Sequence, residues 1–230
     1  MRQIVAQPSS GAPGPPRDRP GALLIGLAFR RAATYGQVVG QVFERLSDRW
    51  RRFIAAQPMY FVATAPSGPD GHVNVSPKGY ADTFAVLDDT TVGYLDLDGS
   101  GVETIAHLRQ NGRVTIMFCS FTRNAKILRL YGRGRVVVPS DPDWAALLGR
   151  FGPHPGVRSI IVVELDLIAD SCGYSVPTMT EVAERDLLDR WARRPDTVAQ
   201  RVDRAGTQRR SIDQIPALAP RETDPAHLQS

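Results

Sequence analysis

The residues with the clearest chemical potential lie in the window HVNVSPKGYAD at 72–82, where Lys78 stands between Pro77 and Gly79. Only two of the 28 basic residues of the chain are lysines, Lys78 and Lys126, and the others are arginines. A chain with this bias has replaced most exchangeable lysines, so a retained lysine calls for a reason. A compact ammonium on a flexible stem suits a phosphate group or a cofactor carbonyl. The alternative is that Lys78 only ends a strand at the surface, and the window alone does not decide between the two.

A second candidate binding feature is the glycine-flanked start of a helix in DLDGSGVETIAHL. Ser100 is followed three residues later by Glu103, a spacing that predicts a capping box. Gly99 and Gly101 would let backbone amides approach a ligand closely. The unpaired amides and the dipole of a helix N-terminus favour an anion, and Thr104 could add a hydroxyl to a bound phosphate. The alternative is that Ser100 only caps the helix.

The periodicity of the apolar residues predicts the elements that must position these side chains. Apolar residues at i, i+3, i+4 and i+7 predict an amphipathic helix from about 38 to 56. Apolar and β-branched runs predict strands at 59–65, 72–77, 84–87, 91–97, 113–121, 126–138 and 160–168. Further helices are expected at about 101–110, 141–150 and 180–194. Strands joined by hairpins, with isolated helices, favour an antiparallel barrel with helices packed outside it, an α+β arrangement.

Composition limits the class of protein. The chain of 230 residues is 42% hydrophobic and 23% charged, as in ordinary globular proteins. Its net charge is +4, but the basic residues are scattered among acids, so nucleic-acid binding is not indicated. Cys119 and Cys172 have no CxxC or Cys/His spacing and the histidines form no HExxH, so no disulfide framework and no metal site are predicted. A reduced, cytoplasmic setting is the simplest interpretation.

The two ends of the chain differ from its middle. Residues 8–20 are rich in Pro, Gly and Ser and are expected to be disordered. The apolar run at 22–29 is too short to span a bilayer, and two arginines follow it where a secretory signal would place them before it. We therefore expect no targeting segment and no membrane contact. The expected division is an extension at 1–37, a folded domain at 38–180, and a C-terminal helix and tail at 181–230.

The order FVATA, VNVSPKGYAD, a hairpin, YLDLDGSGVETIAHL, NGRVTIMFCSF and KILRLYGRGRVV resembles the pyridoxamine 5′-phosphate oxidase-like family of flavin-binding split barrels. Within that superfamily it is similar to the branch of pyridoxamine-phosphate-oxidase-related FMN-binding proteins. The resemblance covers roughly 40–180, and segments at 170–179, 184–191 and 209–218 also look like that branch. Each segment is short, and the specificity comes from their order.

The resemblance implies a six-stranded antiparallel split β-barrel that forms a homodimer and holds FMN in two grooves at the subunit interface. It implies that the domain at 38–180 binds the FMN and that Lys78 lies near it. Asn74 and Ser76 alternate on one face of the same strand and would turn polar groups toward the flavin.

The loop at Ser100 departs from the family's pattern. The oxidases carry Ser-Arg-Lys there and grip the FMN phosphate, whereas this chain has Gly101 and Val102 after the serine. Two phosphate charges are therefore missing. Backbone amides at Gly101, the hydroxyl of Thr104, or an arginine such as Arg129 or Arg133 would have to compensate.

The function that the resemblance implies is an FMN-dependent oxidoreductase acting on a small molecule. Pyridoxamine phosphate itself is not the expected substrate, because the Arg/His elements that hold it have no clear counterpart. No catalytic residue is assigned, since a bound flavin carries the redox chemistry. His107 is interpreted as half-buried packing, and the two cysteines as inert. The alternatives are a deazaflavin-dependent reductase, a flavin- or haem-binding protein without turnover, and a dimeric scaffold without a cofactor.

Overall fold

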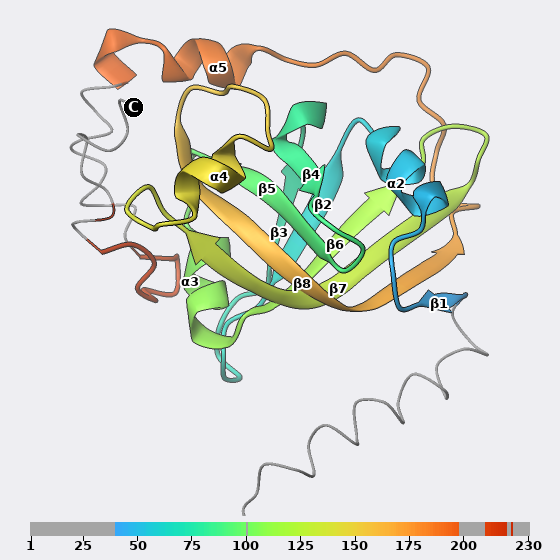
Figure 1. Cartoon of the computed structure of the whole chain (residues 1–230), viewed down its shortest axis with the longest axis horizontal. Helices are drawn as coiled ribbons and strands as arrows, with labels where there is room; N and C mark the ends of the chain where they lie inside the picture. Colours follow the sequence, from blue (N-terminus) through green and yellow to red (C-terminus); the bar gives the residue numbers. More distant parts are fainter. Residues whose placement is uncertain (1–39, 100, 198–209, 220–221, 223–230) are drawn as a thin grey trace, which may run out of the picture.

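A strongly curved antiparallel sheet forms the centre of the protein, and short helices lie around it (Figure 1). The structure is a computed structural model that describes residues 40–99, 101–197, 210–219 and 222. The strands are β1 (Val42–Phe43), β2 (Tyr60–Thr64), β3 (Asn74–Lys78), β4 (Phe84–Val86), β5 (Thr91–Leu97), β6 (Arg113–Cys119), β7 (Lys126–Val137) and β8 (Val157–Cys172). The helices are α2 (Asp48–Ala55), α3 (Glu103–Asn111), α4 (Trp144–Leu148) and α5 (Leu187–Ala192), and η1 (Ala81–Thr83) is a short 3-10 helix.

The order of the strands explains why the barrel is split. The sheet runs β3-β2-β6-β7-β8-β5-β4, and β1 adds to β8. Its two ends are therefore β3 and the β5–β4 hairpin. The long pair β7 and β8 changes register between Tyr131 and Gly132, where a bulge helps the sheet to bend. We call the gap between β3 and β5 the seam, because no backbone ladder joins these two strands in the described part of the chain.

Alternation along the strands gives the sheet an inner and an outer face. In β2 the side chains of Tyr60, Val62 and Thr64 are buried, whereas Phe61 and Ala63 between them are half-buried. The inner side chains meet the helices in one core: in α2, Trp50 is 1% exposed and packs edge-on against Phe43 and Phe53. The sheet thus presents one face to this core, while the opposite face is covered along β5 and β8 by a second, smaller apolar cluster.

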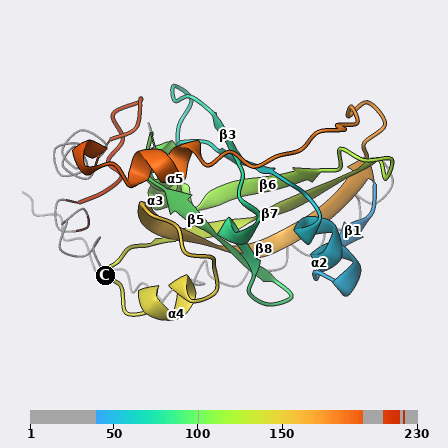
Figure 2. The same cartoon turned by 90° about the horizontal axis from the view of Figure 1, so that it is seen from above.

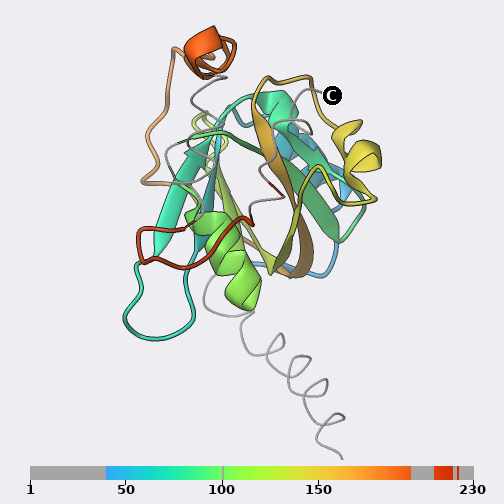
Figure 3. The ribbon, with the colours of Figure 1, turned by 90° about the vertical axis from the view of Figure 1, so that its left-hand side faces the viewer.

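The helices cover separate parts of the curved sheet. On the side away from β3, α4 packs against β5 and β8, where Trp144 contacts a cluster formed by Leu95, Ile160 and Val162 (Figure 2). At one end of the barrel lies α3, and the C-terminal segment 210–219 runs beside it (Figure 3). Ala217 and Leu218 of that segment are buried in the same core as the barrel residues. None of the helices in the described ranges combines the length and apolar character needed to cross a bilayer.

The predicted fold class is confirmed: the protein is mainly β, an antiparallel open barrel with flanking helices. Each of the seven predicted strands is present, within a few residues of its predicted ends except for β8. That strand extends to Val157–Cys172, beyond the predicted 160–168, because its ends pair with β5, β7 and β1. The extension expected at 1–37 lies outside the described residues, and the proposed division into domains stays a prediction.

The predicted helix over 38–56 is wrong in its first half. Val42 and Phe43 form β1 and pair with Ala169 and Ile168 of β8, and the helix begins only at Asp48. Free backbone groups at the edge of β8 can pair with a passing segment. The helical spacing was misleading because Phe43 still packs against Trp50 from its strand.

Two other helix predictions need correction. The N-cap of α3 is Val102, which makes no side-chain capping bond, so the helix begins two residues later than the predicted capping box requires. The carboxylate of Glu103 instead accepts a hydrogen bond from the Ile212 amide of the C-terminal segment (3.2 Å). Ser100 itself lies outside the described residues. The last helix, predicted at 180–194, is only Leu187–Ala192, because the residues before it are exposed and have no core to pack on.

The glycine that ends α3 allows the effect of its backbone conformation on stability to be tested. Gly112 closes the helix with φ of +69°, in the left-handed region where a Cβ is strained. We expect Gly112→Ala to lower the free energy of unfolding by about 1–2 kcal/mol, measured by urea denaturation. Gly149→Ala is the matched control, because Gly149 ends α4 in the right-handed region with ordinary space for a methyl group. An equal loss in both variants would show that the φ of Gly112 is not the cause.

Candidate functional site

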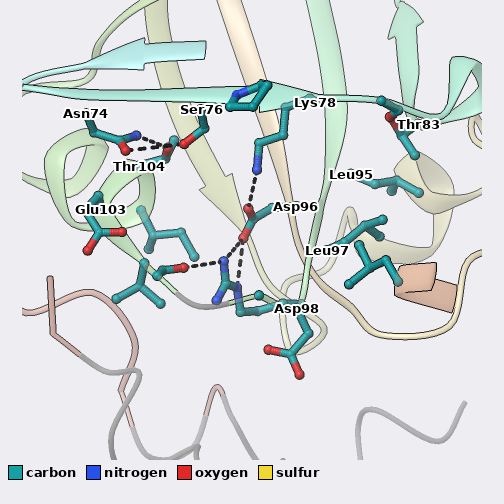
Figure 4. A pocket seen from close by; sticks show the side chains of 18 of the residues that line it. Asn74, Ser76, Lys78, Thr83, Leu95, Asp96, Leu97, Asp98, Glu103 and Thr104 are labelled. Carbon is teal, nitrogen blue, oxygen red and sulfur yellow. Dashed lines mark hydrogen bonds and ion pairs between the residues drawn. The ribbon is translucent and has the colours of Figure 1, made fainter. Parts of the chain in front are cut away.

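A cavity of about 400 Å³ opens in the seam. Its walls come from three segments that are far apart in the sequence: β3 with the following turn, the end of β5, and the first turn of α3 (Figure 4). Arg158 of β8 and Leu188 of α5 complete it. We call this space the seam cavity.

The inner face of β3 supplies a polar wall. Lys78, Ser76 and Asn74 pair in register with Tyr60, Val62 and Thr64, so all three point to the buried side of the sheet. The amide nitrogen of Asn74 donates to Thr104 Oγ1 (3.2 Å), and Ser76 Oγ donates to Asn74 Oδ1 (3.3 Å) (Figure 4). Four of the predicted site residues are therefore neighbours: Asn74, Ser76, Lys78 and Thr104.

The other predicted positions fall into two groups. Gly101 lines the seam cavity, while Ser100 lies outside the described residues and its role stays a prediction. Arg129 is on the outer face, in register with Met117, and donates to Ser171 Oγ (2.9 Å). Arg133 donates to the Asn111 carbonyl (2.7 Å). Neither arginine lines the seam cavity of its own chain.

Asp96 is the centre of charge in the seam cavity, although the sequence did not single it out. Its side chain is 3% exposed, and its Oδ2 receives Arg158 Nη2 (2.8 Å), Arg158 Nε (2.9 Å) and Ser159 Oγ (3.2 Å). Lys78 Nζ lies 3.6 Å from Asp96 Oδ1. Burial raises the pKa of Asp96, but the charges of Arg158 and Lys78 and these hydrogen bonds outweigh it and lower the pKa. Asp96 is therefore a stable anion.

The same ion pair ties the two ends of the sheet together. Lys78 belongs to β3 and Asp96 to β5, so their contact crosses the seam where no backbone hydrogen bonds do. Arg158 also donates to the Gly101 carbonyl (3.0 Å), which attaches the start of α3 to β8. The charged groups thus hold all three walls of the seam cavity in place.

The charges at the seam cavity are mixed. Among the described residues that line it, the cations are Lys78 and Arg158 and the carboxylates are Asp96, Asp98 and Glu103. The backbone supplies further positive character, because the first N–H groups of a helix have no partner within it. In α3 the first hydrogen bond within the helix runs from the Ala106 amide to the Val102 carbonyl, so the amides before Ala106 have no partner within the helix. An anionic ligand would therefore meet amides and one ammonium, with acidic groups close by.

The remaining titratable candidates lie away from the seam cavity. His107 is fully buried, not half-buried as expected, and its Nδ1 is 3.0 Å from Thr64 Oγ1. Burial lowers its pKa. Cys119 is buried, which raises the pKa of its thiol and keeps it unreactive. Among the described residues, His, Cys, Asp and Glu side chains form no group of three or more that could hold a metal ion.

A relative and a family model place the chain among known proteins. The model of the pyridoxamine 5′-phosphate oxidase family matches residues 46–172, which is more than half of the chain. The pyridoxamine 5′-phosphate oxidase family protein ustO of Aspergillus flavus is 44% identical over 140 residues. That alignment covers 60% of this chain and 56% of ustO, so the chain spans a little over half the length of this relative.

Solved structures with a similar arrangement are more distant. The HupZ protein of Group A Streptococcus has a TM-score of 0.41 and 19% identity, covering 52% of this chain and 89% of that chain. An FMN-binding protein from Syntrophomonas wolfei has a TM-score of 0.40 and 14% identity, covering 58% of this chain and 85% of that chain. At these values the likenesses carry no argument about function.

The matched range begins just before α2 and ends with β8, so it includes β3, β5, the start of α3 and Arg158. It therefore contains all of the seam cavity except Leu188. On this match, the chain belongs to the pyridoxamine 5′-phosphate oxidase family.

Proposed function

We propose that the seam cavity binds FMN and that the protein is an FMN-dependent oxidoreductase for a small organic molecule other than pyridoxamine phosphate. The observation that carries the proposal is the convergence of Asn74, Ser76, Lys78 and Thr104 on one cavity beside the first turn of a helix. A volume of about 400 Å³ lies within the usual range for small-molecule sites. The proposal also rests on membership of the family.

The donors and acceptors of the seam cavity fit a flavin nucleotide. Asn74 uses one N–H and one oxygen lone pair within the wall, so it keeps capacity for the carbonyl and N–H groups of a flavin ring. Lys78 and the first amides of α3 suit a phosphate. Asp98 and Glu103 would repel the same phosphate, so we expect this part of the cavity to bind weakly. The absence of the arginine and lysine that the family carries in this loop also predicts weak binding of the phosphate.

The residues of the chain have separable roles in this proposal. A bound flavin would supply the electron-transfer chemistry. Lys78 holds a positive charge at the wall, which would favour negative charge on a bound ring or phosphate, and Asp96 holds Lys78 in position. Leu95, Leu97 and Val102 exclude water from the other side. None of these roles requires a nucleophile or an acid–base residue.

We also infer that two copies of the chain pair through the outer face of β2, β3, β6 and β7. Cross-strand neighbours on this face include Phe61 with Met117, and Ala63 with Val75. Val75 is 59% exposed, and Val73, just before the start of the same strand, is 69% exposed. An apolar, open sheet face of this kind favours association with a partner of the same character. Arg129 lies on this face and would sit at the interface.

A single substitution tests the proposed homodimer. We expect Val75→Arg to shift the protein from dimer to monomer in sedimentation velocity, because it places a charge on the apolar face. Ile212→Arg is the control, since Ile212 is 72% exposed but lies in the C-terminal segment. A wild-type protein that is already monomeric at high concentration would contradict the inference.

The absorption spectrum of purified protein incubated with FMN and desalted tests the cofactor. We expect retained flavin bands. A Soret band in the protein as purified would instead favour a haem-binding role. The mixed charges of the seam cavity argue against a deazaflavin, whose long acidic tail calls for more cations. Flavin retained without any turnover of reduced nicotinamide or test substrates would favour a carrier over an enzyme.

A further inference from the structure

The segment that leads from β8 to α5 is held to the barrel by few packed side chains. Residues 177–187 are all exposed, and this extended stretch crosses the top of the molecule in Figure 1 before α5 begins. Leu187 is 57% exposed, whereas the next residue, Leu188, turns into the seam cavity as part of its wall. A segment with so little apolar burial opens at low cost in free energy. What fixes it is therefore a small set of polar contacts.

The Met179 amide donates to the Phe121 carbonyl (2.9 Å), and the contacts nearest to α5 are made with the turn that follows Lys78. Tyr80 donates its hydroxyl to the Arg185 carbonyl (2.6 Å), and the Ala81 amide donates to Glu184 Oε1 (3.1 Å). Tyr80 also lines the seam cavity. The approach to α5 is thus attached directly to the rim of the cavity that Leu188 closes.

His154 forms the second attachment. Its side chain is 7% exposed, with Nε2 2.8 Å from Asp82 Oδ1 and Nδ1 3.3 Å from Asp189 Oδ1. Its ring stacks on Tyr80, with centroids 5.0 Å apart. Only the protonated imidazole can donate from both nitrogens at once, so two carboxylates on opposite sides select the cation. The histidine joins η1, the loop before β8 and α5.

Tyr80 itself is strained. Its φ is +61°, in the left-handed region that non-glycine residues rarely adopt. Such a backbone persists where its surroundings hold it, and here the ring stack and the bond to Arg185 do so. Release of residues 184–192 would remove the bond to Arg185 from a residue two positions after Lys78, and would leave only the ring stack on His154.

We propose that residues 184–192 are a lid on the seam cavity, latched when His154 is protonated and released when it is neutral. The lid itself does not depend on the proposed function. Its consequence, that the lid controls how fast FMN enters, rests on the proposed function. In the latched state Leu188 and Tyr80 narrow the opening. In the released state the neutral imidazole keeps one N–H, which stays on Nε2 and on the nearer carboxylate of Asp82 (2.8 Å), so Asp189 of α5 (3.3 Å) loses its partner.

The direction of the pH dependence follows from the surroundings of His154. Burial lowers its pKa, but the hydrogen bonds and charges of Asp82 and Asp189 outweigh burial and raise the pKa above 6.5. Tyr80 faces the ring, and Arg193 lies along the neighbouring groove. The contacts of protonated His154 therefore stabilise the closed lid fully below pH 6.5. This stabilisation is lost as the pH rises through the raised pKa of His154.

Hydrogen exchange of the full-length protein without ligand tests the lid. Protection factors of the α5 amides, normalised to unstructured peptide at each pH, are expected to fall roughly ten- to a hundredfold as His154 loses its proton. His154→Gln should show the low protection at every pH, with β6 and β7 unchanged. His72→Gln is the control, because it breaks a His–Asp contact, with Asp213, that involves neither η1 nor α5. Unchanged α5 protection in His154→Gln would overturn the latch.

The gating consequence needs a separate measurement. The rate of FMN association, followed by flavin fluorescence in a stopped flow, should rise in His154→Gln and become independent of pH. If wild type and His154→Gln bound FMN at the same rate although the variant had lost its α5 protection, the lid would not control ligand entry. A protein that binds no FMN would contradict the proposed function, whereas the exchange experiment would still decide whether the latch exists.

Discussion

Replacing Asp96 with alanine is expected to lower the free energy of unfolding by about 3–5 kcal/mol. The side chain of Asp96 is 3% exposed, and its carboxylate is shared by Arg158 and Lys78, whose side chains are 12% and 24% exposed. Its removal leaves a buried guanidinium and a half-buried ammonium without their counter-ion. It also removes the ion pair that joins β3 to β5 across the seam. Urea denaturation at neutral pH measures the loss.

The pH dependence of the same variant identifies the cause. Because the folded pKa of Asp96 is lowered, its contribution is present above its ordinary value of 3.8 and is lost as the pH falls through the folded pKa. The difference between wild type and Asp96→Ala should therefore narrow in that acid range. Asp89→Ala is the control: its contact with Arg51 is exposed and worth no more than about 1 kcal/mol. A loss of equal size in both variants would contradict the central role of Asp96.

Replacing Lys78 with alanine is expected to weaken FMN binding about ten- to a hundredfold, the worth of one charge-assisted contact. The chain provides a close control in its other lysine. Lys126 also pairs with a nearly buried aspartate, Asp170 (2.8 Å), and its side chain is 33% exposed. It does not line the seam cavity.

Comparison of the two lysine variants separates binding from folding. Both lose an ion pair to a buried carboxylate, so both are expected to lose some stability. Only Lys78→Ala should lose affinity when FMN is titrated under conditions where both variants are folded. Equal affinities in the two variants would remove Lys78 from the binding site.

Local periodicity was enough to predict much of the fold. Alternation of period two found the strands and placed Asn74, Ser76 and Lys78 on one face, since side chains of a strand alternate whatever its partner is. It could not distinguish β1 from a helical turn, because Phe43 contacts Trp50 in either conformation. It also could not show that Glu103 would bond to the distant Ile212 amide and not to its own helix start.

The charged centre of the site could not be predicted from the sequence, for a different reason. Asp96 and Arg158 are 62 residues apart, and the register of β5 with β8 brings them together. The one local signal was a carboxylate at an inner position of an apolar strand, in YLDLD, where a buried charge needs a partner. Nothing near Arg158 in the sequence indicated that it was this partner. The latch at His154 is also formed only by the packing of three distant segments.

A crystal structure of the protein grown in excess FMN tests the central claim most directly. We expect FMN in the seam cavity, with hydrogen bonds to Lys78 and to the first turn of α3. Clear density for FMN at another surface, or a seam cavity that stays free of FMN at saturating concentration, would contradict the account.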